Sequence, residues 1–465
     1  MAIGLFIFAI IIQKFTFSSP KDIPAHIDEL QVVGTAINIY NGSINPEFFR
    51  YPSGHINILA LLYIASELLL GDLSISDHYQ IAWYLSNLYM AMIPVLVYVM
   101  CQLLFSQKVG VLGGLISSIS PLLLYHSQYS IVDIPMTFYV TLFFTYAAYC
   151  YKNNKLGNNS LMILGTITGI AISMKYTAGL LIPPLLLMSY NYNQSRRTYF
   201  LSDKYYTIIT YSIVLVLFSL GSAILFFLEL IKNYFESYTT DGIVEIEYVR
   251  GLKTLGTFGI LVALAILIVI IFKKNNLIKI IKNIISPTNF TILAIVFFTF
   301  FILSPFTIIE YKAAFGDFMY ESRHMKIGSA AQYHHLSDQY KNIIENLNQW
   351  YPLNFYYNLL FDQFGLLSIL LFIFGLITVI KEKIWFNYSL FVFFILMLFT
   401  LITWQNVAAR YFLCLIPIVY LLVLKGFSDL LILVNNKLNS KSLVFYCMGL
   451  LLMFDQLALY YKFFY

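Results

Sequence analysis

The sequence predicts an all-α polytopic membrane protein, and this prediction rests on its composition and its repeated apolar runs. Hydrophobic residues make up 60% of the 465 residues and charged residues only 11%, whereas soluble domains contain roughly 25% charged residues. The mean hydropathy of +0.76 is far above what a soluble core can bury. Apolar runs of roughly 17 to 25 residues can cross a bilayer as helices, and the chain contains about thirteen of them.

The predicted spans follow one another along the whole chain, separated by short polar turns and a few longer loops. The first run begins at Met1 without a basic region and without an A-x-A cleavage motif. It is therefore predicted to be an uncleaved anchor, with a truncated start as the open alternative. The predicted spans are 1–17, 79–105, 108–125, 131–151, 157–174, 175–191, 205–230, 254–272, 288–307, 361–380, 384–403, 408–431 and 442–463.

Charge and cysteine usage argue against several functional classes. A net charge of +5 over this length is not a basic patch, so no nucleic acid is expected as a partner. The four cysteines lie in or at the ends of apolar runs without CxxC spacing, and they are interpreted as packing residues. The sequence contains no GxxxxGK[ST] loop and no glycine-rich dinucleotide turn, so direct use of a nucleotide donor has little support.

Basic residues in the short loops predict the orientation, because cytoplasmic loops are enriched in lysine and arginine. The loop 273–283 carries four lysines, and the loop 191–204 carries two arginines and a lysine. With these loops in the cytoplasm, the alternate connections face the outside. The predicted outer segments are 18–78, 126–131, 231–253 and 308–360. The last of them is interpreted as a lid or acceptor-binding loop of a single membrane domain that covers 1–465.

Two helices are predicted within the first outer segment. The stretch 28–40 has apolar residues at helical spacing, which is typical of a helix lying on the membrane surface. Its predicted apolar face consists of Leu30, Val33, Ile37 and Tyr40. The run 54–70 is short for a span and carries His55 and Glu67, so it is interpreted as an interfacial or re-entrant helix, with a fourteenth span as the alternative.

Carboxylates stand at the start of two predicted helices on the same side of the membrane. Asp28 and Glu29 begin the helix 28–40, where acidic residues stabilise the helix dipole by about 0.3 to 1 kcal/mol, so a simple cap is one interpretation. Asp133, followed by Pro135, also fits a helix N-cap. The competing interpretation is functional, because an ionisable group at membrane depth costs roughly 2.5 to 3.5 kcal/mol.

Two cations are predicted at the same outer level. Lys175 lies between two apolar runs, and Arg410 stands at the outer end of a span. Both positions depart from the enrichment of basic residues on the cytoplasmic side, so each cation needs an anionic partner. A substrate phosphate is one candidate partner, and snorkelling to the phosphates of ordinary lipids is the alternative.

Three stretches carry a resemblance to a known family: HIDELQVVGTAINIYNGSINPEFFRYPSG, YHSQYSIVDIPMTFYVTLFF and GIAISMKYTAGLLIPP. Together they resemble the polyprenyl-phosphate-sugar-dependent glycosyltransferases of the GT-C superfamily. The likeness is strongest to the dolichyl-phosphate-mannose-protein mannosyltransferase family (glycosyltransferase family 39) and its bacterial and archaeal relatives, which include aminoarabinose transferases. It is firm over 20–190 and looser beyond, where SPFTIIE and ARYFLCLIPIVYLL fit the same pattern.

The resemblance implies a GT-C fold with juxtamembrane helices in the first outer loop, and a multi-pass protein of the plasma membrane. It also implies an inverting transfer of a sugar from a polyprenyl phosphate to a hydroxyl of a protein, lipid or glycan of the cell envelope, at the outer face. Carried over residue by residue, it makes Asp28 the general base or acceptor-positioning carboxylate, Glu29 its neighbour, and Asp133 the acid of the second outer loop. Lys175 and Arg410 would bind the donor phosphate. The further substrate-binding candidates are His26, Arg50, Tyr51, Tyr176 and His324, with His334 and His335 beside them.

The chemistry needs such a set of residues. Charge that builds up on the departing phosphate requires preorganised cations, and the attacking hydroxyl requires a carboxylate that accepts its proton. A divalent metal held by Asp28 and Asp133 stays open, because carboxylate oxygens suit hard cations.

Other classes of protein remain as alternatives. One is a multi-span transporter or flippase of lipid-linked sugars, for which Glu229 and Asp455 in late spans are the best evidence. Another is a polysaccharide polymerase or ligase, which would also use a lipid-linked donor.

Overall fold

The structure is a computed structural model of the 465-residue chain. The structure describes residues 1–16, 26–196, 203–228, 286–327, 350–382, 384–435 and 441–464, together with scattered positions between 230 and 267. The predicted span 254–272 and the histidines His334 and His335 therefore lie partly or wholly outside the described residues.

The described residues form helices joined by short connections, as the composition predicts. The helices are α1 (Ala2–Thr16), α2 (Ile27–Tyr40), α3 (Gly54–Leu70), α4 (Ile75–Leu104), α5 (Gln107–Ser118), α6 (Pro121–Ser127), α7 (Asp133–Lys152), α8 (Asn158–Met174), the 3-10 helix η1 (Tyr176–Leu181), α9 (Ile182–Arg196), α10 (Asp203–Phe226), α13 (Pro287–Leu303), α14 (Phe306–Ile309), α15 (Tyr311–Ile327), α17 (Tyr351–Lys381), α18 (Trp385–Thr403), the 3-10 helix η3 (Ala409–Leu415), α19 (Ile416–Asn435) and α20 (Lys441–Phe464).

Five of the described helical segments are long and apolar enough to cross a membrane, and the bent pair α5 and α6 makes a sixth. Shorter apolar helices, including α1, α3, α8 and α13, accompany them. An integral membrane protein is therefore confirmed, but the count of about thirteen spans is not.

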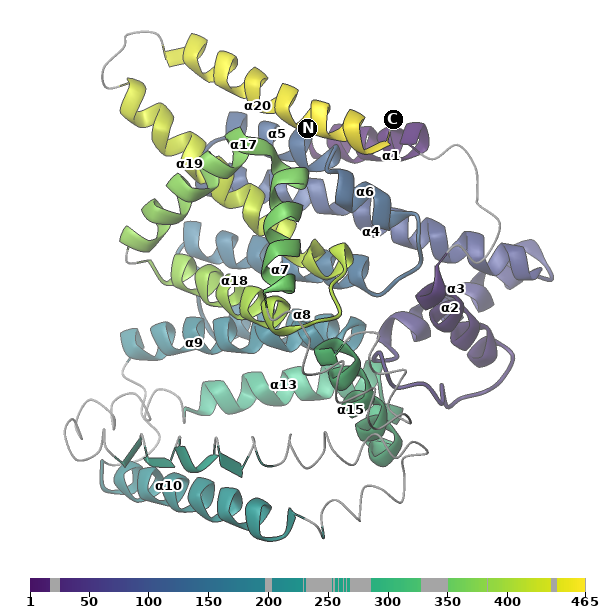
Figure 1. The fold of residues 1–465 in the computed structure, drawn as a ribbon, viewed down its shortest axis with the longest axis vertical. Coiled ribbons are helices and arrows are strands. Elements are labelled where there is room, and N and C mark those ends of the chain that lie inside the picture. Colours follow the sequence, from purple (N-terminus) through teal and green to yellow (C-terminus); the bar gives the residue numbers. More distant parts are fainter. Residues whose placement is uncertain are drawn as a thin grey trace.

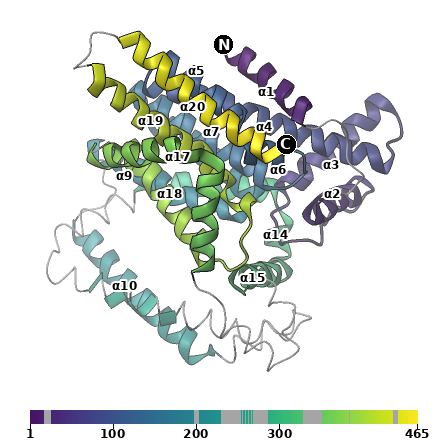
Figure 2. The same ribbon diagram turned by 45° about the horizontal axis from the view of Figure 1, so that its top comes forward.

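The helices are arranged as a bundle with an attached side structure (Figures 1 and 2). The large core cluster draws buried side chains from α4, α7, α8, α17, α18 and α19, among others. Helices α2 and α3 lie together beside the N-terminal end of α4 (Figure 1) and share a smaller apolar cluster that includes Val32, Ile56 and Tyr63. Helix α15 lies below this side structure in Figure 1, and its Asp317 accepts a hydrogen bond from the Phe49 N–H, so the two predicted outer segments meet there.

The apolar face predicted for α2 is partly wrong. Val32, Val33 and Ala36 are buried, whereas Leu30 is 52% exposed. The helix packs on one side against α3 and turns Leu30 away from that contact. Helical spacing alone fits more than one face, and the actual neighbour selects between them.

The run predicted as one span at 108–125 is broken. Helices α5 and α6 meet at an angle of 52°, because Pro121 lacks an N–H and its ring obstructs a continuing helix. The side chain of Gln363 compensates at the break, where its Oε1 accepts a hydrogen bond from the Leu122 N–H at 3.0 Å and its Nε2 donates to Ser120 Oγ at 2.9 Å.

Helix α17 begins ten residues before the predicted span 361–380 and is kinked within it. Gly365 has φ of 71°, a left-handed conformation that glycine adopts without a Cβ penalty. The Asp455 carboxylate of α20 lies against it, 2.6 Å from where a Cβ at position 365 would stand. The Gln456 side chain donates to the Phe364 carbonyl at 2.9 Å, so polar groups of α20 stabilise the break.

Two glycines allow α17 and α19 to pack backbone against backbone. A Cβ on Gly375 would collide with the Leu422 carbonyl, and a Cβ on Gly426 with the Leu371 carbonyl. Small residues at such crossings let membrane helices approach closely.

Replacing Gly426 by valine is therefore expected to lower the free energy of unfolding by about 1 to 3 kcal/mol through overpacking. Gly34→Ala is the matched control, since a Cβ at that helical position meets nothing within 4 Å. Thermal unfolding in detergent measures both variants, and equal midpoints for Gly426→Val and the parent would contradict the close packing.

Candidate active site

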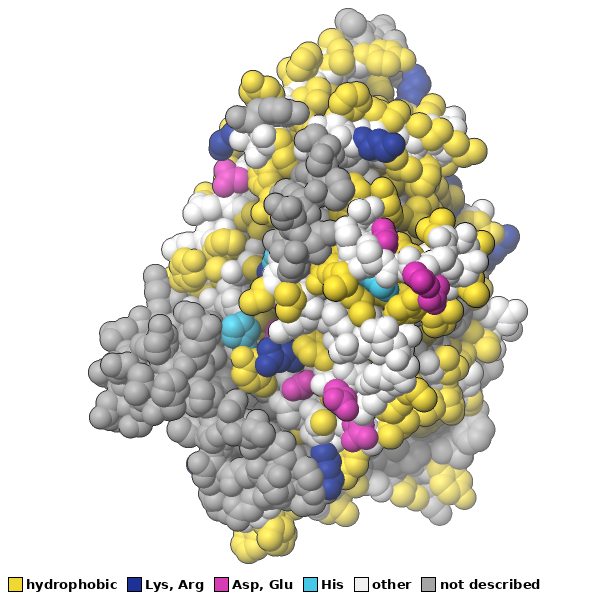
Figure 3. All heavy atoms as spheres, turned by 90° about the vertical axis from the view of Figure 1, so that its right-hand side faces the viewer, with side chains coloured by type: hydrophobic (Ala, Val, Ile, Leu, Met, Phe, Trp, Pro, Cys, Tyr) yellow, Lys and Arg dark blue, Asp and Glu magenta, His cyan; other side chains and the backbone are white. Residues whose placement is uncertain are grey.

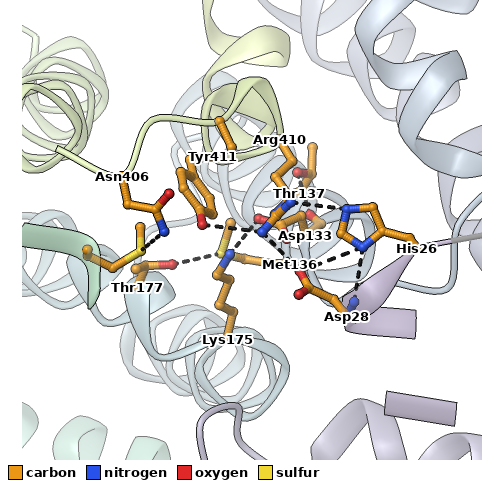
Figure 4. A network of polar contacts seen from close by, with 12 residues as sticks. His26, Asp28, Asp133, Met136, Thr137, Lys175, Thr177, Asn406, Arg410 and Tyr411 are labelled. Atoms are coloured by element: carbon orange, nitrogen blue, oxygen red, sulfur yellow. Dashed lines mark hydrogen bonds and ion pairs between the residues drawn. The ribbon is translucent and has the colours of Figure 1, made fainter. Parts of the chain in front are cut away.

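A cluster of charged and aromatic side chains forms where four parts of the chain converge (Figure 4). His26 and Asp28 come from the start of α2, Asp133 from the first turn of α7, Lys175 from the junction of α8 and η1, and Arg410 from η3. The sequence predicts each of these residues as part of one site, and the structure brings them together.

Asp28 is paired with Arg410. The Arg410 Nη2 atom lies 3.1 Å from Asp28 Oδ2, and the two side chains are only 18% and 13% exposed. Asp28 does not cap its helix, because the N-cap is His26, whose Nδ1 accepts a hydrogen bond from the Asp28 N–H at 3.1 Å. The Asp28 carboxylate is therefore directed into the cluster instead of toward the helix end.

His26 lies between the backbone of α2 and Arg410. Its Nε2 is 3.1 Å from Arg410 Nη1, and its ring is 5.4 Å from that of Tyr129. Burial lowers the pKa of the His26 imidazole, with Asp28 opposing this shift and Arg410 adding to it. The Asp28 N–H faces Nδ1 and Arg410 faces Nε2, but only one nitrogen of a neutral imidazole can accept a hydrogen bond. The tautomer of His26 therefore decides which of the two donors is bonded. Movement of Arg410 would be coupled to the tautomer of His26.

Asp133 is paired with Lys175. Lys175 Nζ donates to Asp133 Oδ1 at 2.6 Å, and the side chains are 10% and 2% exposed. The N-cap of α7 is Val132 without a side-chain hydrogen bond, so Asp133 is not the cap that Pro135 suggests. The ammonium of Lys175 is the partner that this nearly buried carboxylate needs.

Tyr411 connects the two ion pairs. Its ring lies 4.9 Å from Lys175 Nζ and 5.0 Å from Arg410 Cζ, and its hydroxyl accepts a hydrogen bond from Arg410 Nη2 at 3.3 Å. Tyr51 offers a second ring, 5.8 Å from Lys175 Nζ. Burial, reinforced by the nearby carboxylates of Asp28 and Glu321, raises the pKa of Tyr51 well above its usual value, so its hydroxyl stays neutral.

Glu29 has a structural contact. It is 5% exposed, and its Oε1 accepts a hydrogen bond from the Ser130 N–H at 3.0 Å. Glu29 lies in the first turn of α2, where an acidic residue stabilises the helix dipole, and its carboxylate also joins the first outer segment to the turn before α7. This contact helps to fix Asp28 and Asp133 relative to each other.

A pocket of about 290 Å³ opens beside the cluster. Its wall contains Lys175 and Tyr411, whereas Arg410 lies behind Tyr411 and Asp28 behind Arg410. The other wall residues are mainly aromatic and aliphatic. The whole wall consists of Arg50, Tyr51, Lys175, Tyr176, Thr177, Gly179, Leu180, Phe318, Glu321, Ser322, Met325, Thr400, Trp404 and Tyr411.

Hydrogen bonds fix the segments that form the pocket. The Phe49 N–H donates to Asp317 of α15 at 2.8 Å, and the Tyr176 hydroxyl donates to the Phe49 carbonyl at 3.1 Å. The Asn406 N–H donates to the Met325 carbonyl at 3.0 Å.

On the face shown in Figure 3, hydrophobic side chains cover much of the upper part, and acidic, basic and histidine side chains gather in the middle and lower parts.

The remaining substrate-binding candidates lie at or near this pocket. Arg50, Tyr51 and Tyr176 are in its wall. His324 is beside it, and its ring stacks on Tyr320 at 6.2 Å with planes 8° apart. The guanidinium of Arg50 also lies over Tyr320, with its Cζ 4.2 Å from the centre of the ring. Arg50 has no carboxylate partner within the part of the chain that the structure describes.

The arrangement does not fit a metal held by Asp28 and Asp133. Each of these carboxylates faces a protein cation, at 3.1 Å and 2.6 Å. Among the described residues, no group of three or more His, Cys, Asp or Glu side chains has metal-binding geometry. The chemistry proposed below therefore uses the chain's own groups.

Sequence reasoning missed Tyr411 and Glu321. Tyr411 follows Arg410 directly, but nothing in the sequence indicates that its ring lies between two cations. Glu321 belongs to a helix whose pocket side carries Phe318, Ser322 and Met325 at helical spacing. That spacing is a signal for one helix face, but the sequence does not say which structure this face meets.

Comparison with known proteins supports the resemblance seen in the sequence. Residues 73–221, which are less than half of the chain, match the family model described as dolichyl-phosphate-mannose-protein mannosyltransferase. The match includes Asp133 and Lys175. None of the curated proteins compared with the chain matches it.

Solved structures that resemble the chain include an archaeal oligosaccharyltransferase and ArnT. The archaeal oligosaccharyltransferase AglB from Archaeoglobus fulgidus, in complex with an inhibitory peptide and a dolichol-phosphate, is 12% identical, with a TM-score of 0.52 over 100% of this chain and 55% of that chain. The apo form of the A. fulgidus oligosaccharyltransferase is 10% identical, with a TM-score of 0.50 over 100% of this chain and 56% of that chain. ArnT from Cupriavidus metallidurans, bound to undecaprenyl phosphate, is 12% identical, with a TM-score of 0.45 over 92% of this chain and 59% of that chain.

These likenesses define the fold. The chain has the all-helical GT-C fold and resembles the mannosyltransferase family over the matched residues. It spans about half the length of the archaeal oligosaccharyltransferase.

Proposed function

We propose that the protein is an inverting glycosyltransferase that moves a sugar from a polyprenyl phosphate to an acceptor hydroxyl. The observation that carries this proposal is the cluster of two carboxylates and two cations beside a pocket lined by a further cation, Arg50, which has no carboxylate partner among the described residues. The name of the matching family and the dolichol-phosphate in the AglB complex support a lipid-linked donor of this chemistry.

The donor phosphate is assigned to Arg50, Lys175 and Arg410. Lys175 and Arg410 each face a carboxylate, whereas Arg50 lines the pocket and faces none in the part of the chain that is described. A phosphate that enters the pocket meets Arg50 and Lys175 first, and it competes with Asp28 and Asp133 for the paired cations. Cations fixed in this way stabilise the charge that develops on the phosphate as the sugar departs.

Asp28 is assigned as the general base. Once the phosphate draws Arg410 away from it, the carboxylate accepts the proton of the acceptor hydroxyl. The acceptor oxygen then forms its bond to the anomeric carbon from the face opposite the phosphate. The bond between that carbon and the phosphate oxygen breaks, and its electron pair leaves with the polyprenyl phosphate. One such displacement inverts the anomeric centre without a covalent sugar intermediate.

The lipid tail determines where the site must be. Because the tail stays in the bilayer, the phosphate can only be reached at a membrane interface. The basic residues of the short loops favour the outer side for that interface, and we assign it to the plasma membrane, with a protein, lipid or glycan as acceptor. Helix α15, which follows α14, contributes residues to the wall of the pocket and would then act as a lid or acceptor-binding segment.

A transporter has less support. Asp455, one of its two best candidates in the sequence, lies against the kink at Gly365 next to Gln456, which is a structural position. The other, Glu229, lies outside the described residues. The polar groups near the kink stabilise a broken helix and do not line any of the described pockets.

Arg50→Gln is expected to weaken the binding of citronellyl phosphate, a short-chain isoprenyl phosphate, by about tenfold or more, because a charge-assisted hydrogen bond contributes roughly 1.5 to 3 kcal/mol. Titration calorimetry of the detergent-solubilised protein measures this affinity. Lys462→Gln is the control, since that lysine is 74% exposed and pairs with Asp362 on the surface. Failure of the parent protein to bind citronellyl phosphate would contradict the proposed function, and unchanged binding in Arg50→Gln would remove Arg50 from the site.

A further inference from the structure

Three charged side chains from three separate segments line the pocket: Arg50 from the loop after α2, Lys175 from the end of α8, and Glu321 from α15. Lys175 is neutralised by Asp133. Arg50 and Glu321 line the same pocket, yet neither has an ion-pair partner within the residues that the structure describes. Among the residues that the structure describes, the pocket thus presents a cation and a carboxylate without ion-pair partners to its ligand.

The two unpaired groups are held near each other without direct contact. Arg50 stacks on Tyr320, the residue before Glu321, at 4.2 Å. Burial raises the pKa of the Glu321 carboxyl, although His324, Lys175 and Arg50 act in the opposite direction. A carboxylate in direct contact with one of these cations would be stabilised in its charged form. Glu321 is therefore a partly buried acid whose hydrogen-bonding capacity is left for a ligand.

The size and the charges of the pocket define what the ligand offers. At about 290 Å³ the pocket is just below the roughly 300 to 1,000 Å³ that is typical of ligand sites, so it has room for a head group and not for a polyprenyl chain as well. The head needs an anionic part for Arg50 and hydrogen-bond donors for Glu321. A phosphate joined directly to a sugar has both, since the sugar hydroxyls lie next to the phosphate.

We propose that Glu321 binds the sugar of the donor and selects neutral or amine-bearing sugars over acidic sugars. This inference rests on the proposed function and names the substrate class of the same site. Hydroxyl and amino groups donate hydrogen bonds to a carboxylate. A uronic acid would place a second carboxylate against Glu321 in a partly buried pocket, where like charges repel strongly.

The test compares two ligands that differ only at one carbon. Citronellyl phosphoglucose and citronellyl phosphoglucuronate share the lipid, the phosphate and the ring, and citronellyl phosphate alone reports on the phosphate site. The parent protein is expected to bind the glucose ester about tenfold or more tightly than the glucuronate ester, and Glu321→Gln is expected to reduce this preference to about threefold or less. Glu321→Asp retains the charge and should retain the preference.

Asp362→Asn is the matched control, because it also removes one acidic charge but from a side chain that is 66% exposed. Its preference between the two esters should equal that of the parent. If Glu321→Gln binds citronellyl phosphate and shows the same preference between the two esters as the parent, the assignment of Glu321 is overturned and the proposed function is not. If the parent protein does not bind citronellyl phosphate, the proposed function is overturned, and this inference with it.

Discussion

Replacing Asp28 by asparagine is expected to lower the rate of sugar transfer by about 10²- to 10⁴-fold, which is the usual contribution of a general base. Asparagine retains the size of the side chain but cannot accept the proton of the acceptor hydroxyl. Membranes that contain the variant, supplied with dolichyl or undecaprenyl phosphomannose, report the rate. Mass spectrometry of cell-envelope glycans from cells with the parent or the variant tests transfer with the native donor.

The ion pair with Arg410 complicates this experiment, because Asp28→Asn also leaves a guanidinium with 18% exposure without its carboxylate. Asp28→Asn combined with Arg410→Gln removes both charges and should regain stability without regaining activity. Asp72→Asn changes an exposed acid of the same outer segment and serves as the control. Transfer by Asp28→Asn at the parent rate would exclude Asp28 from the mechanism.

The sequence predicts this site well in one respect, because acids and cations at the ends of apolar runs are unusual and therefore visible. Asp28, Asp133, Lys175 and Arg410 stand out for this reason, and the structure places them in one cluster. Their pairing is not visible, because it depends on contacts between distant segments. Asp133 and Lys175 are 42 residues apart, and His26 and Arg410 are 384 apart. The phosphate expected as the partner of the two cations is replaced in the structure by carboxylates of the chain.

The fold, like the site, can be predicted from the sequence only in part. Composition and apolar runs predict the membrane class and most of the helices, because a bilayer imposes both length and polarity. The breaks are harder to predict. Pro121 signals the bend between α5 and α6, but the kink at Gly365 depends on Asp455 and Gln456 from another helix. Glu321 was missed for a similar reason, since an acid on an amphipathic helix is usually solvated and only the structure shows that this one lines a pocket.

Replacing Asp133 by asparagine is expected to lower the free energy of unfolding by about 3 to 5 kcal/mol, the range seen when one partner of a buried ion pair is removed. The Asp133 and Lys175 side chains are 2% and 10% exposed, so the ammonium would be left nearly buried without its counter-charge. Lys175→Met alone should also destabilise the protein, because it leaves the carboxylate unpaired. Asp133→Asn together with Lys175→Met removes both charges and should recover most of the loss. Thermal unfolding in detergent measures all three variants, and additive losses in the double variant would show that the pair is not coupled as the geometry indicates.

The same double variant separates the stability of the protein from its binding of the donor. Because Lys175 is assigned to the donor phosphate, the folded double variant should bind citronellyl phosphate about tenfold or more weakly than the parent, since it lacks a cation that the phosphate needs.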